Sequence, residues 1–181
     1  DWSLNGGLRY ETVTSDYYSF GQYQTEPSRK YHDLFPNISV GWQKNKWGIQ
    51  LGYNKRISRP NYQALNSNVQ YDNRYEYEGG NPLLRPTIKQ NLDLNVTYSW
   101  LNFTAGYSYN KDLRLSFGSL YQEGTEITLW TNRNFDKFES FNTSLTASPK
   151  FGFYSPTLTL SYWQQNFDTQ AYGLATKLNK P

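Results

Sequence analysis

The chain has 181 residues, a net charge of +3 and no cysteine. Its length suits one domain, the lack of cysteine excludes a disulfide framework and thiolate chemistry, and basic residues outside any run do not favour nucleic-acid binding. The mean hydropathy is −0.84, and no apolar run approaches the roughly 18 to 20 residues of a spanning helix, which excludes a helical membrane protein. A transmembrane β-barrel is still compatible, because only every second residue of its strands needs to be apolar.

Alternating apolar and polar residues predict long β-strands, because successive side chains of a strand point to opposite faces. In chain order, strands are expected at residues 2–11, 35–43, 47–58, 89–99, 102–117, within 128–148 and at 154–167, with the start of an eighth in 170–181. Long loops at about 15–33, 59–87 and around 122–125 alternate with short turns at 44–46, 99–101 and 149–152. Outer-membrane barrels sort connections in this way, with short turns on one side of the membrane and long loops on the other.

The two faces of the predicted strands differ in chemistry. One face is apolar and carries no Asp, Glu, Lys or Arg until the outer ends, as at Lys55 and Lys111. A basic side chain that faces lipid at mid-depth costs roughly 2 to 4 kcal/mol. The opposite face is rich in Asn, Ser, Thr and Gly, which suits a wet or plugged lumen. The predicted strands are also longer than the usual 5 or 6 residues and long enough for the roughly 9 to 11 residues that span a bilayer at a tilt.

Tryptophan gathers at the short turns, where a membrane interface would lie. Aromatic residues make up 18% of the chain, with 17 Tyr and 6 Trp, as is typical where amphipathic rings line an interface. Trp42 and Trp47 flank one turn, Trp100 lies in the next, and Trp2 begins the first strand. The alternative is that Trp is simply common in strands. We therefore predict that the protein lies in the cell outer membrane of a Gram-negative bacterium, with its short turns in the periplasm and its long loops outside the cell.

A motif in the longest loop resembles a known family. In residues 57–66, a strand ends at Ser-Arg-Pro and a loop that contains Tyr62 follows. Residues 78–86 read Glu-Gly-Gly-Asn-Pro-Leu-Leu-Arg-Pro and lead into the next strand. These residues resemble the barrel of TonB-dependent outer-membrane receptors, and in particular the outer membrane protein beta-barrel family. The resemblance is specific over about residues 48–98. The alternation predicts an all-β, antiparallel up-and-down meander of seven or eight long strands, and the resemblance implies that this meander is part of a transmembrane β-barrel of the 22-stranded class with a plugged lumen.

The resemblance also implies partners. Residues 1–181 are expected to form a single barrel segment, with the plug domain, the TonB-box region and the remaining strands outside it. The implied partners are outer-membrane lipid, the plug domain of the same full-length chain, a TonB-type energy-coupling protein reached through the missing regions, and an imported large ligand: a glycan, a peptide or a metal chelate. The work of such a receptor is transport by recognition and gating, so neither an enzyme activity nor a cofactor is expected.

The longest loop supplies the candidate site residues. Proline removes a ladder donor and fixes φ, and Gly and Asn tolerate positive φ. The residues expected to shape the loop are Arg59, Pro60, Gly80, Asn81, Pro82 and Pro86. Tyrosine offers rigid stacking area and a hydroxyl for gripping sugars or peptides, and the predicted ligand-binding residues are Tyr62, Arg74, Tyr75, Tyr77 and Asn81. The alternative is a structural role, as loop scaffold and loop-to-loop packing.

No catalytic or metal-binding constellation is predicted. His32 is the single histidine, and one His makes neither a His-rich metal site nor a usual triad. Asp72, Glu76 and Glu78 lie close together in the long loop, where paired carboxylates could serve acid–base work or bind calcium. No ordered ligand pattern accompanies them, so a solvated loop is favoured.

Two other functions fit the same alternation. A soluble all-β carbohydrate- or peptide-binding module would also alternate, and the length would allow a small closed eight-stranded outer-membrane barrel. The soluble module differs in where the apolar face lies. Ile49, Leu92 and Leu158 would interlock in a compact interior in the module, whereas they would face lipid in a membrane barrel.

Overall fold

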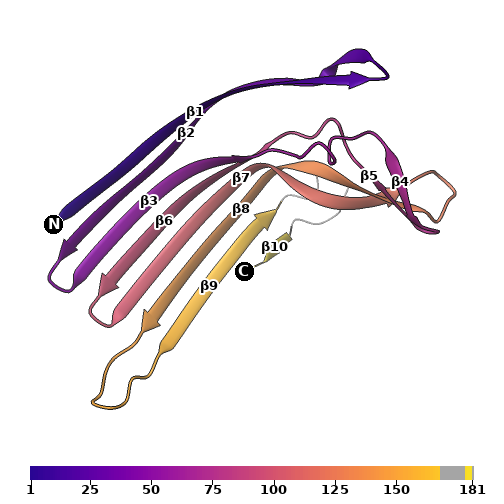
Figure 1. Ribbon diagram of the computed structural model, residues 1–181. Coiled ribbons are helices and arrows are strands. Elements are labelled where there is room, and N and C mark those ends of the chain that lie inside the picture. Colours follow the sequence, from indigo (N-terminus) through magenta and orange to yellow (C-terminus); the bar gives the residue numbers. More distant parts are fainter. Residues whose placement is uncertain (168–177, 181) are drawn as a thin grey trace.

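The computed structural model describes residues 1–167 and 178–180, and these residues form one long, curved, mostly antiparallel sheet (Figure 1). Its strands are β1 (Trp2–Ser19), β2 (Gln22–Lys44), β3 (Trp47–Ser58), β4 (Val69–Asn73), β5 (Glu76–Gly79), β6 (Thr87–Tyr98), β7 (Leu101–Leu120), β8 (Thr128–Ala147), β9 (Leu158–Phe167) and β10 (Leu178–Lys180). Over the described ranges, no helix is long and apolar enough to cross a membrane.

The strand order confirms the predicted meander. The long strands pair antiparallel in the order β1, β2, β3, β6, β7, β8 and β9. β4 and β5 form a hairpin inside the segment 59–87, and β5 pairs parallel with the start of β8. The predicted eighth strand is described only as β10, which pairs with β9; the rest of 170–181 lies outside the described residues. Among the described strands, β1 pairs only with β2, so the sheet does not close on itself.

The loop predicted for residues 15–33 is wrong. β1 and β2 stay paired as far as Ser19 and Gln22, with one irregularity after Ser15. Both faces of this extension carry mostly polar side chains, so the apolar–polar alternation that marks a strand is lost. The reversal is a two-residue turn in which Phe20 and Gly21 have φ values of 48° and 77°, as a type I′ hairpin turn requires.

The last predicted turn is displaced by about two residues, and the predicted start of the strand after it is wrong. The reversal lies at Gly152 and Phe153, between two backbone hydrogen bonds that join Phe151 and Tyr154, and β9 begins at Leu158 rather than at Tyr154. Pro156 cannot donate a ladder hydrogen bond, which delays the strand. The two shorter turns are as predicted, with Asn45 and Ser99 in the left-handed region.

The single-layered sheet has two chemically distinct faces. Pairing aligns one apolar row across the long strands, made of Trp2, Trp42, Ile49, Val96, Phe103, Leu145 and Leu160. The neighbouring row on the other face is polar and consists of Ser3, Gly41, Gln50, Asn95, Thr104, Ser144 and Ser161. No second layer covers the apolar face in the described part of the chain. Ile49, Leu92 and Leu158 are 37%, 45% and 62% exposed, which excludes the soluble module, because a sandwich buries this face.

The consecutive apolar side chains on this face of the long strands together form a band, which we call the apolar belt. The belt crosses the strands obliquely. On β1 it extends to Tyr10, whereas on β9 it ends at Tyr162, which pairing places in the row of Leu4. The margin therefore moves by six residues (from 10 to 4) over the six strand-to-strand steps from β1 to β9. With roughly 3.3 Å per residue and about 4.8 Å between strands, one residue per step corresponds to a strand tilt of roughly 35°. Membrane barrels have this tilt.

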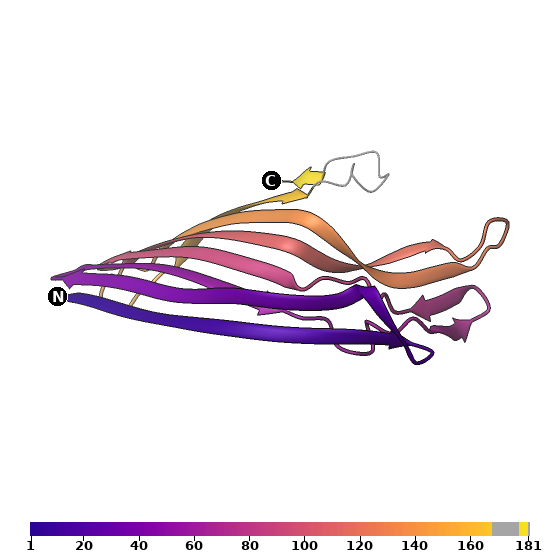
Figure 2. The ribbon, with the colours of Figure 1, turned by 90° about the horizontal axis from the view of Figure 1, so that it is seen from above.

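The connections are sorted by end, as predicted. The turns 45–46 and 99–100 and the connection 148–157 lie at the end of the sheet that also holds the N-terminus, and the β1–β2 tip, the β4–β5 hairpin and the β7–β8 loop lie at the other (Figures 1 and 2). Aromatic pairs mark the short-turn end: the ring centroids of Trp2 and Trp42 are 6.3 Å apart, and those of Trp47 and Tyr98 are 4.4 Å apart.

Candidate ligand-binding site

Three segments meet at the long-loop end of the sheet, and we refer to them together as the platform: residues 12–33 of the β1–β2 hairpin, the motif segment 59–87, and residues 112–135 of β7, β8 and their loop. The ladder between β2 and β3 ends at Asn37 and Asn54, beyond which the hairpin projects away from the rest of the sheet (Figure 1). The motif segment lies beside the separated hairpin, and residues of both line one groove.

Arg59 ties the start of the motif segment to the hairpin. Its guanidinium forms an ion pair and hydrogen bond with Glu11, whose carboxylate also pairs with Arg9 at 3.0 Å. Glu11 lies on the polar face, just beyond the apolar belt that ends at Tyr10. The hydrogen bond from Arg59 lowers the pKa of the Glu11 carboxyl below its ordinary value, because it stabilises the charged form.

Gly80 and Asn81 fold the motif segment back on itself. A Cβ at Gly80 would lie 2.1 Å from the carbonyl oxygen of Asn66, so only glycine allows this approach of two backbones. The Asn81 backbone N–H donates to the Ala64 carbonyl at 2.7 Å, and its side-chain oxygen accepts from the Leu83 N–H at 2.9 Å. Its side-chain NH₂ donates to the Asn132 carbonyl of β8 at 3.1 Å. Asn81 therefore joins the motif segment to the sheet.

Arg85 and Asn134 make the second tie, which sequence reasoning missed. The Asn134 side-chain oxygen accepts from the Arg85 N–H at 2.7 Å, and its NH₂ group donates to the carbonyls of Arg85 and Asp112 at 2.9 and 2.8 Å. The Arg85 guanidinium pairs with Asp112 at 2.7 Å and with Asp136 at 3.2 Å. Asp112 is in the left-handed region, with φ of 55°.

The predicted gripping residues do not form one cluster. Tyr62 is 92% exposed on the turn after Arg59. Tyr77 packs between Tyr71 and Tyr121, with ring centroids 5.7 and 4.9 Å away. The Arg74 guanidinium lies 5.6 Å from the ring centroid of its neighbour Tyr75, at the tip of the β4–β5 hairpin. Tyr77 thus makes the loop-to-loop packing that was the alternative role.

Two grooves flank residues 61–65 of the motif segment. The hairpin groove, of about 370 Å³, lies between the motif segment and the β1–β2 hairpin. Its lining includes Tyr17, Tyr31, Tyr62, Arg29, Arg59 and Pro82, and burial raises the pKa of the Tyr31 hydroxyl. The amide groove, of about 250 Å³, lies between the motif segment and the outer part of β7 and β8.

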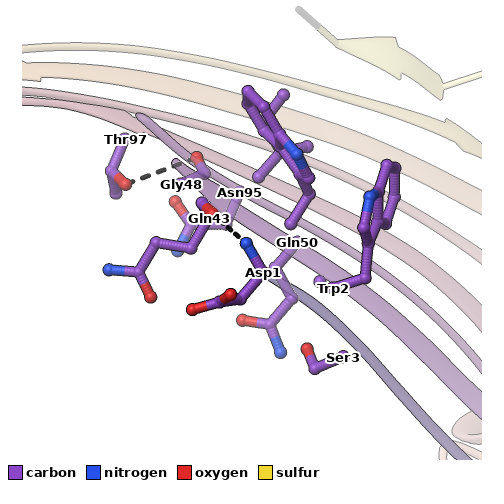
Figure 3. A pocket seen from close by; sticks show the side chains of 11 residues that line it. Asp1, Trp2, Ser3, Gln43, Gly48, Gln50, Asn95 and Thr97 are labelled. Atoms are coloured by element: carbon purple, nitrogen blue, oxygen red, sulfur yellow. Dashed lines mark hydrogen bonds between the residues drawn. The ribbon is translucent and has the colours of Figure 1, made fainter. Parts of the chain in front are cut away.

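The polar face continues to the short-turn end, where it forms a third pocket of about 380 Å³ (Figure 3). The N-terminal amino group donates to the Gln43 carbonyl at 2.7 Å, and the Thr97 hydroxyl donates to the Gly48 carbonyl at 3.3 Å. The side-chain oxygen of Asn95 is buried in this wall without a hydrogen-bond partner among the described residues. The face is therefore polar and crowded rather than apolar, as predicted for a wet or plugged lumen.

The isolated ionisable residues make surface contacts. The Nδ1 atom of His32 lies 3.3 Å from the hydroxyls of both Tyr10 and Thr12. The Glu76 carboxylate accepts from the side chains of Asn73 and Trp130, at 2.8 and 3.3 Å. Over residues 1–167 and 178–180, no three His, Cys, Asp or Glu side chains converge as a metal site would require.

The open tilted sheet, the aromatic rim and the motif-built platform agree with a family model that matches residues 1–179, that of the outer membrane protein beta-barrel family. The chain belongs to this family. No curated protein matches it. As a member of this family the chain is part of an outer-membrane β-barrel, and the predicted resemblance is confirmed.

Solved structures of larger receptors share the fold. The siderophore receptor PirA of Pseudomonas aeruginosa aligns with a TM-score of 0.59 and 13% identity, over 90% of this chain and 37% of that one. The ferric enterobactin receptor PfeA, in a complex with BCV-L6, gives 0.54 and 14% over 92% and 28%. The FrpB iron transporter of Neisseria meningitidis gives 0.52 and 16% over 92% and 24%. This chain thus spans only 24% to 37% of these relatives. The small closed eight-stranded barrel does not fit the pairing of the described strands, which leaves the sheet open.

Proposed function

We propose that this family member is one segment of the barrel wall of a TonB-dependent receptor, which binds a large ligand at the platform and imports it. The observation that carries the proposal is the oblique apolar belt, whose slope fits a tilted membrane barrel, beneath a platform with two grooves. A belt of this kind fixes the sheet in lipid, and the grooves then stand at one mouth of the barrel. Ligand pockets occur preferentially at such mouths.

The proposal assigns the platform to the outside of the cell and the short turns to the periplasm. The aromatic pairs Trp2–Trp42 and Trp47–Tyr98 suit a membrane interface, since Trp and Tyr are enriched at both interfaces, and the short turns beside them suit its periplasmic side. The polar face, with the buried unpartnered oxygen of Asn95, suits contact with a plug domain of the full-length chain. A plug moved by a TonB-type energy-coupling protein would open the path for the ligand.

Within this proposal the predicted site residues divide into two groups. Tyr62 lines the hairpin groove, and Arg74 and Tyr75 are exposed at the tip of the β4–β5 hairpin, so these three are free to touch a ligand. Tyr77, Asn81 and Gly80 position the loops, together with Arg59, Pro60, Pro82 and Pro86. The contribution of the protein is binding and gating, with no covalent step.

The test is uptake by living cells. A strain that lacks the full-length gene and a strain that lacks TonB are compared with the parent for accumulation of labelled ferric siderophores, oligosaccharides and peptides. We expect at least one ligand class to accumulate in the parent and in neither mutant, and re-supplying the gene to restore it. Equal accumulation of every class in the parent and the gene-disrupted strain, with the protein present in the parent outer membrane, would contradict the proposal.

A further inference from the structure

The amide groove has a composition that differs from the rest of the platform. It lies between the motif segment and the outer part of β7 and β8, on the polar face of the sheet. Six of its lining residues carry side-chain amides: Asn61, Gln63, Asn66, Asn68, Gln70 and Asn132. Glu78 is the one ionisable residue among the described side chains that line it. A ligand in this groove therefore meets many neutral donors and acceptors and a single negative charge.

Most of these polar groups are available for a ligand. Within the described residues, the side chains of Gln63, Asn68, Gln70 and Glu78 make no hydrogen bond. The Asn61 side-chain oxygen is used locally, accepting from the Ala64 N–H at 2.9 Å, and that of Asn66 accepts from the Asn68 N–H at 3.0 Å. These two bonds fix the turn that presents the free amides. An amide offers two donors and an acceptor with two lone pairs, so each free side chain can make several hydrogen bonds.

Trp130 gives the groove a fixed aromatic wall. Trp130 is 41% exposed, and its ring packs on the backbone at Gly118, where an added Cβ would lie 3.3 Å from the ring. Its indole N–H donates to the Glu76 carboxylate at 3.3 Å, and β8 is held to β5 by parallel pairing at Glu78 and Trp130. The ring is thereby oriented before any ligand arrives, which lowers the entropic cost of binding.

We infer that the amide groove binds one unit of a neutral glycan, which deepens the proposed function and rests on it. Sugar hydroxyls donate and accept at once, as the amides do, and a carboxylate accepts strong hydrogen bonds from two neighbouring hydroxyls. The apolar C–H face of a sugar ring packs on an indole ring. The volume of about 250 Å³ is below that of most drug-sized ligand sites, so it suits one sugar unit of a longer chain.

The charge of the groove argues against the other ligand classes. An anionic glycan or an anionic metal chelate would meet the Glu78 carboxylate with no Lys or Arg among the described lining residues to offset it. An apolar ligand would strip water from the amides without replacing their hydrogen bonds, which is costly. The hairpin groove, whose lining holds Arg29 and Arg59 against the one carboxylate of Asp16, is the place where an anionic group would be expected instead.

The experiment uses the full-length receptor purified in detergent. It is screened on an array of neutral, sialylated and sulfated glycans, together with a peptide library, and hits are measured by titration calorimetry. We expect binding to at least one neutral glycan, weakened about fivefold by Gln70→Ala and by Glu78→Gln and at least about tenfold by Trp130→Ala. Gln165→Ala, at an exposed glutamine of β9 outside the platform, is the matched control and should leave binding unchanged.

The outcomes separate the inference from the proposed function. The side chains of Gln70 and Glu78 make no internal hydrogen bond, and their backbone pairing does not depend on them, so both variants are expected to fold even if Trp130→Ala does not. Binding of no neutral glycan, or binding that Gln70→Ala and Glu78→Gln leave unchanged, overturns the inference. Binding of sialylated glycans, sulfated glycans or peptides alone overturns it too. TonB-dependent uptake of a siderophore or peptide would leave the proposed function standing in those cases, whereas absence of any gene-dependent uptake would remove both.

Discussion

The apolar belt and the platform are parts of the same strands, but they are held together differently. In the belt, backbone ladders join the strands, and the side chains need only be apolar towards lipid and polar towards the lumen. In the platform, named side chains join segments that are far apart in the sequence, through Arg59–Glu11, Asn81–Asn132 and Arg85–Asn134. Lipid covers the apolar side chains of the belt, whereas the apolar side chains of the platform must be covered by other parts of the protein.

The buried apolar side chains follow the same division. Phe35, Leu84 and Phe135 are the buried hydrophobic residues of the described chain, and all three lie in the platform or at its base. The Phe35 ring lies under the cations of Arg9 and Lys55, at 5.1 and 5.4 Å. We conclude that substitutions in the belt should act through polarity, whereas substitutions in the platform should act through the loss of specific partners.

The largest effect is expected from a cation placed in the apolar belt. Arginine at Leu51, Leu94 or Leu160 of the full-length protein should each cost roughly 2 to 4 kcal/mol, as a cation facing lipid at mid-depth does. We expect a marked loss of heat-modifiable protein in the outer-membrane fraction. Gln50→Arg is the matched control, because Gln50 lies on the polar face one residue away, and it should assemble normally. Unchanged assembly of all three arginine variants would contradict the lipid-facing assignment.

The second prediction breaks the platform and leaves the belt intact. Asn134→Ala removes the side chain that bonds the Arg85 N–H and the carbonyls of Arg85 and Asp112. The loss of three hydrogen bonds, two of them exposed and one part-buried, should destabilise the docking of the motif segment by about 1 to 3 kcal/mol, because each contributes about 0.5 to 1.5 kcal/mol net. We expect faster proteolysis between residues 59 and 87 with normal outer-membrane assembly. Asn132→Ala is the control: it keeps the backbone carbonyl that accepts from Asn81, so this variant should be cleaved at the same rate as the unaltered protein. Equal cleavage rates of Asn134→Ala and Asn132→Ala would show that the bonds between Asn134 and Arg85 do not hold the motif segment.

The belt was largely predictable from the sequence, because its one requirement is periodic. β3 occupies Trp47–Ser58, the range that alternation predicts, and the two tight turns lie where predicted. The extension of β1 and β2 beyond the belt was not predicted, because it lacks this periodic pattern. One of its faces is exposed and the other lines the hairpin groove, so neither face meets lipid and nothing forces the side chains to alternate.

The platform was predictable only in part. The Gly-Asn-Pro motif indicates a reversal, and the structure has one, with Gly80 packed against the carbonyl of Asn66. The partners of that reversal come from β7 and β8, far along the chain, and no local pattern connects them. The amide groove depends on the parallel pairing of β5 with β8, which an up-and-down meander does not predict. The density of Asn and Gln in residues 61–70 was the one signal available in the sequence.

The smallest expected effect concerns pH and again separates the two regions. The pKa of Glu11 is lowered from 4.5 by the hydrogen bond from Arg59. A carboxyl whose pKa is lower in the folded state adds stability that is complete above its unfolded pKa and is lost as pH falls through the folded pKa. Docking of the motif segment on the hairpin should therefore be unaffected from pH 8 to 5 and loosen only below about pH 4.5.

Hydrogen exchange at pH 7 and pH 3.5, corrected for intrinsic rates, measures this directly. We expect amides of residues 12–19 and 59–66 to lose protection at the lower pH, while those of β3 and β6 within the belt do not change, since ladders between neutral backbone groups do not titrate. Glu11→Gln keeps the shape but not the charge, so its protection at residues 59–66 should already be reduced at pH 7 and nearly independent of pH. Arg9 also faces Glu11, at 3.0 Å, so Arg9→Gln serves as the control that leaves the Arg59 bond in place. If Glu11→Gln loses protection at pH 3.5 as the unaltered protein does, Glu11 is not the group whose protonation loosens the docking. The pH dependence of the platform would then arise from another ionisable group.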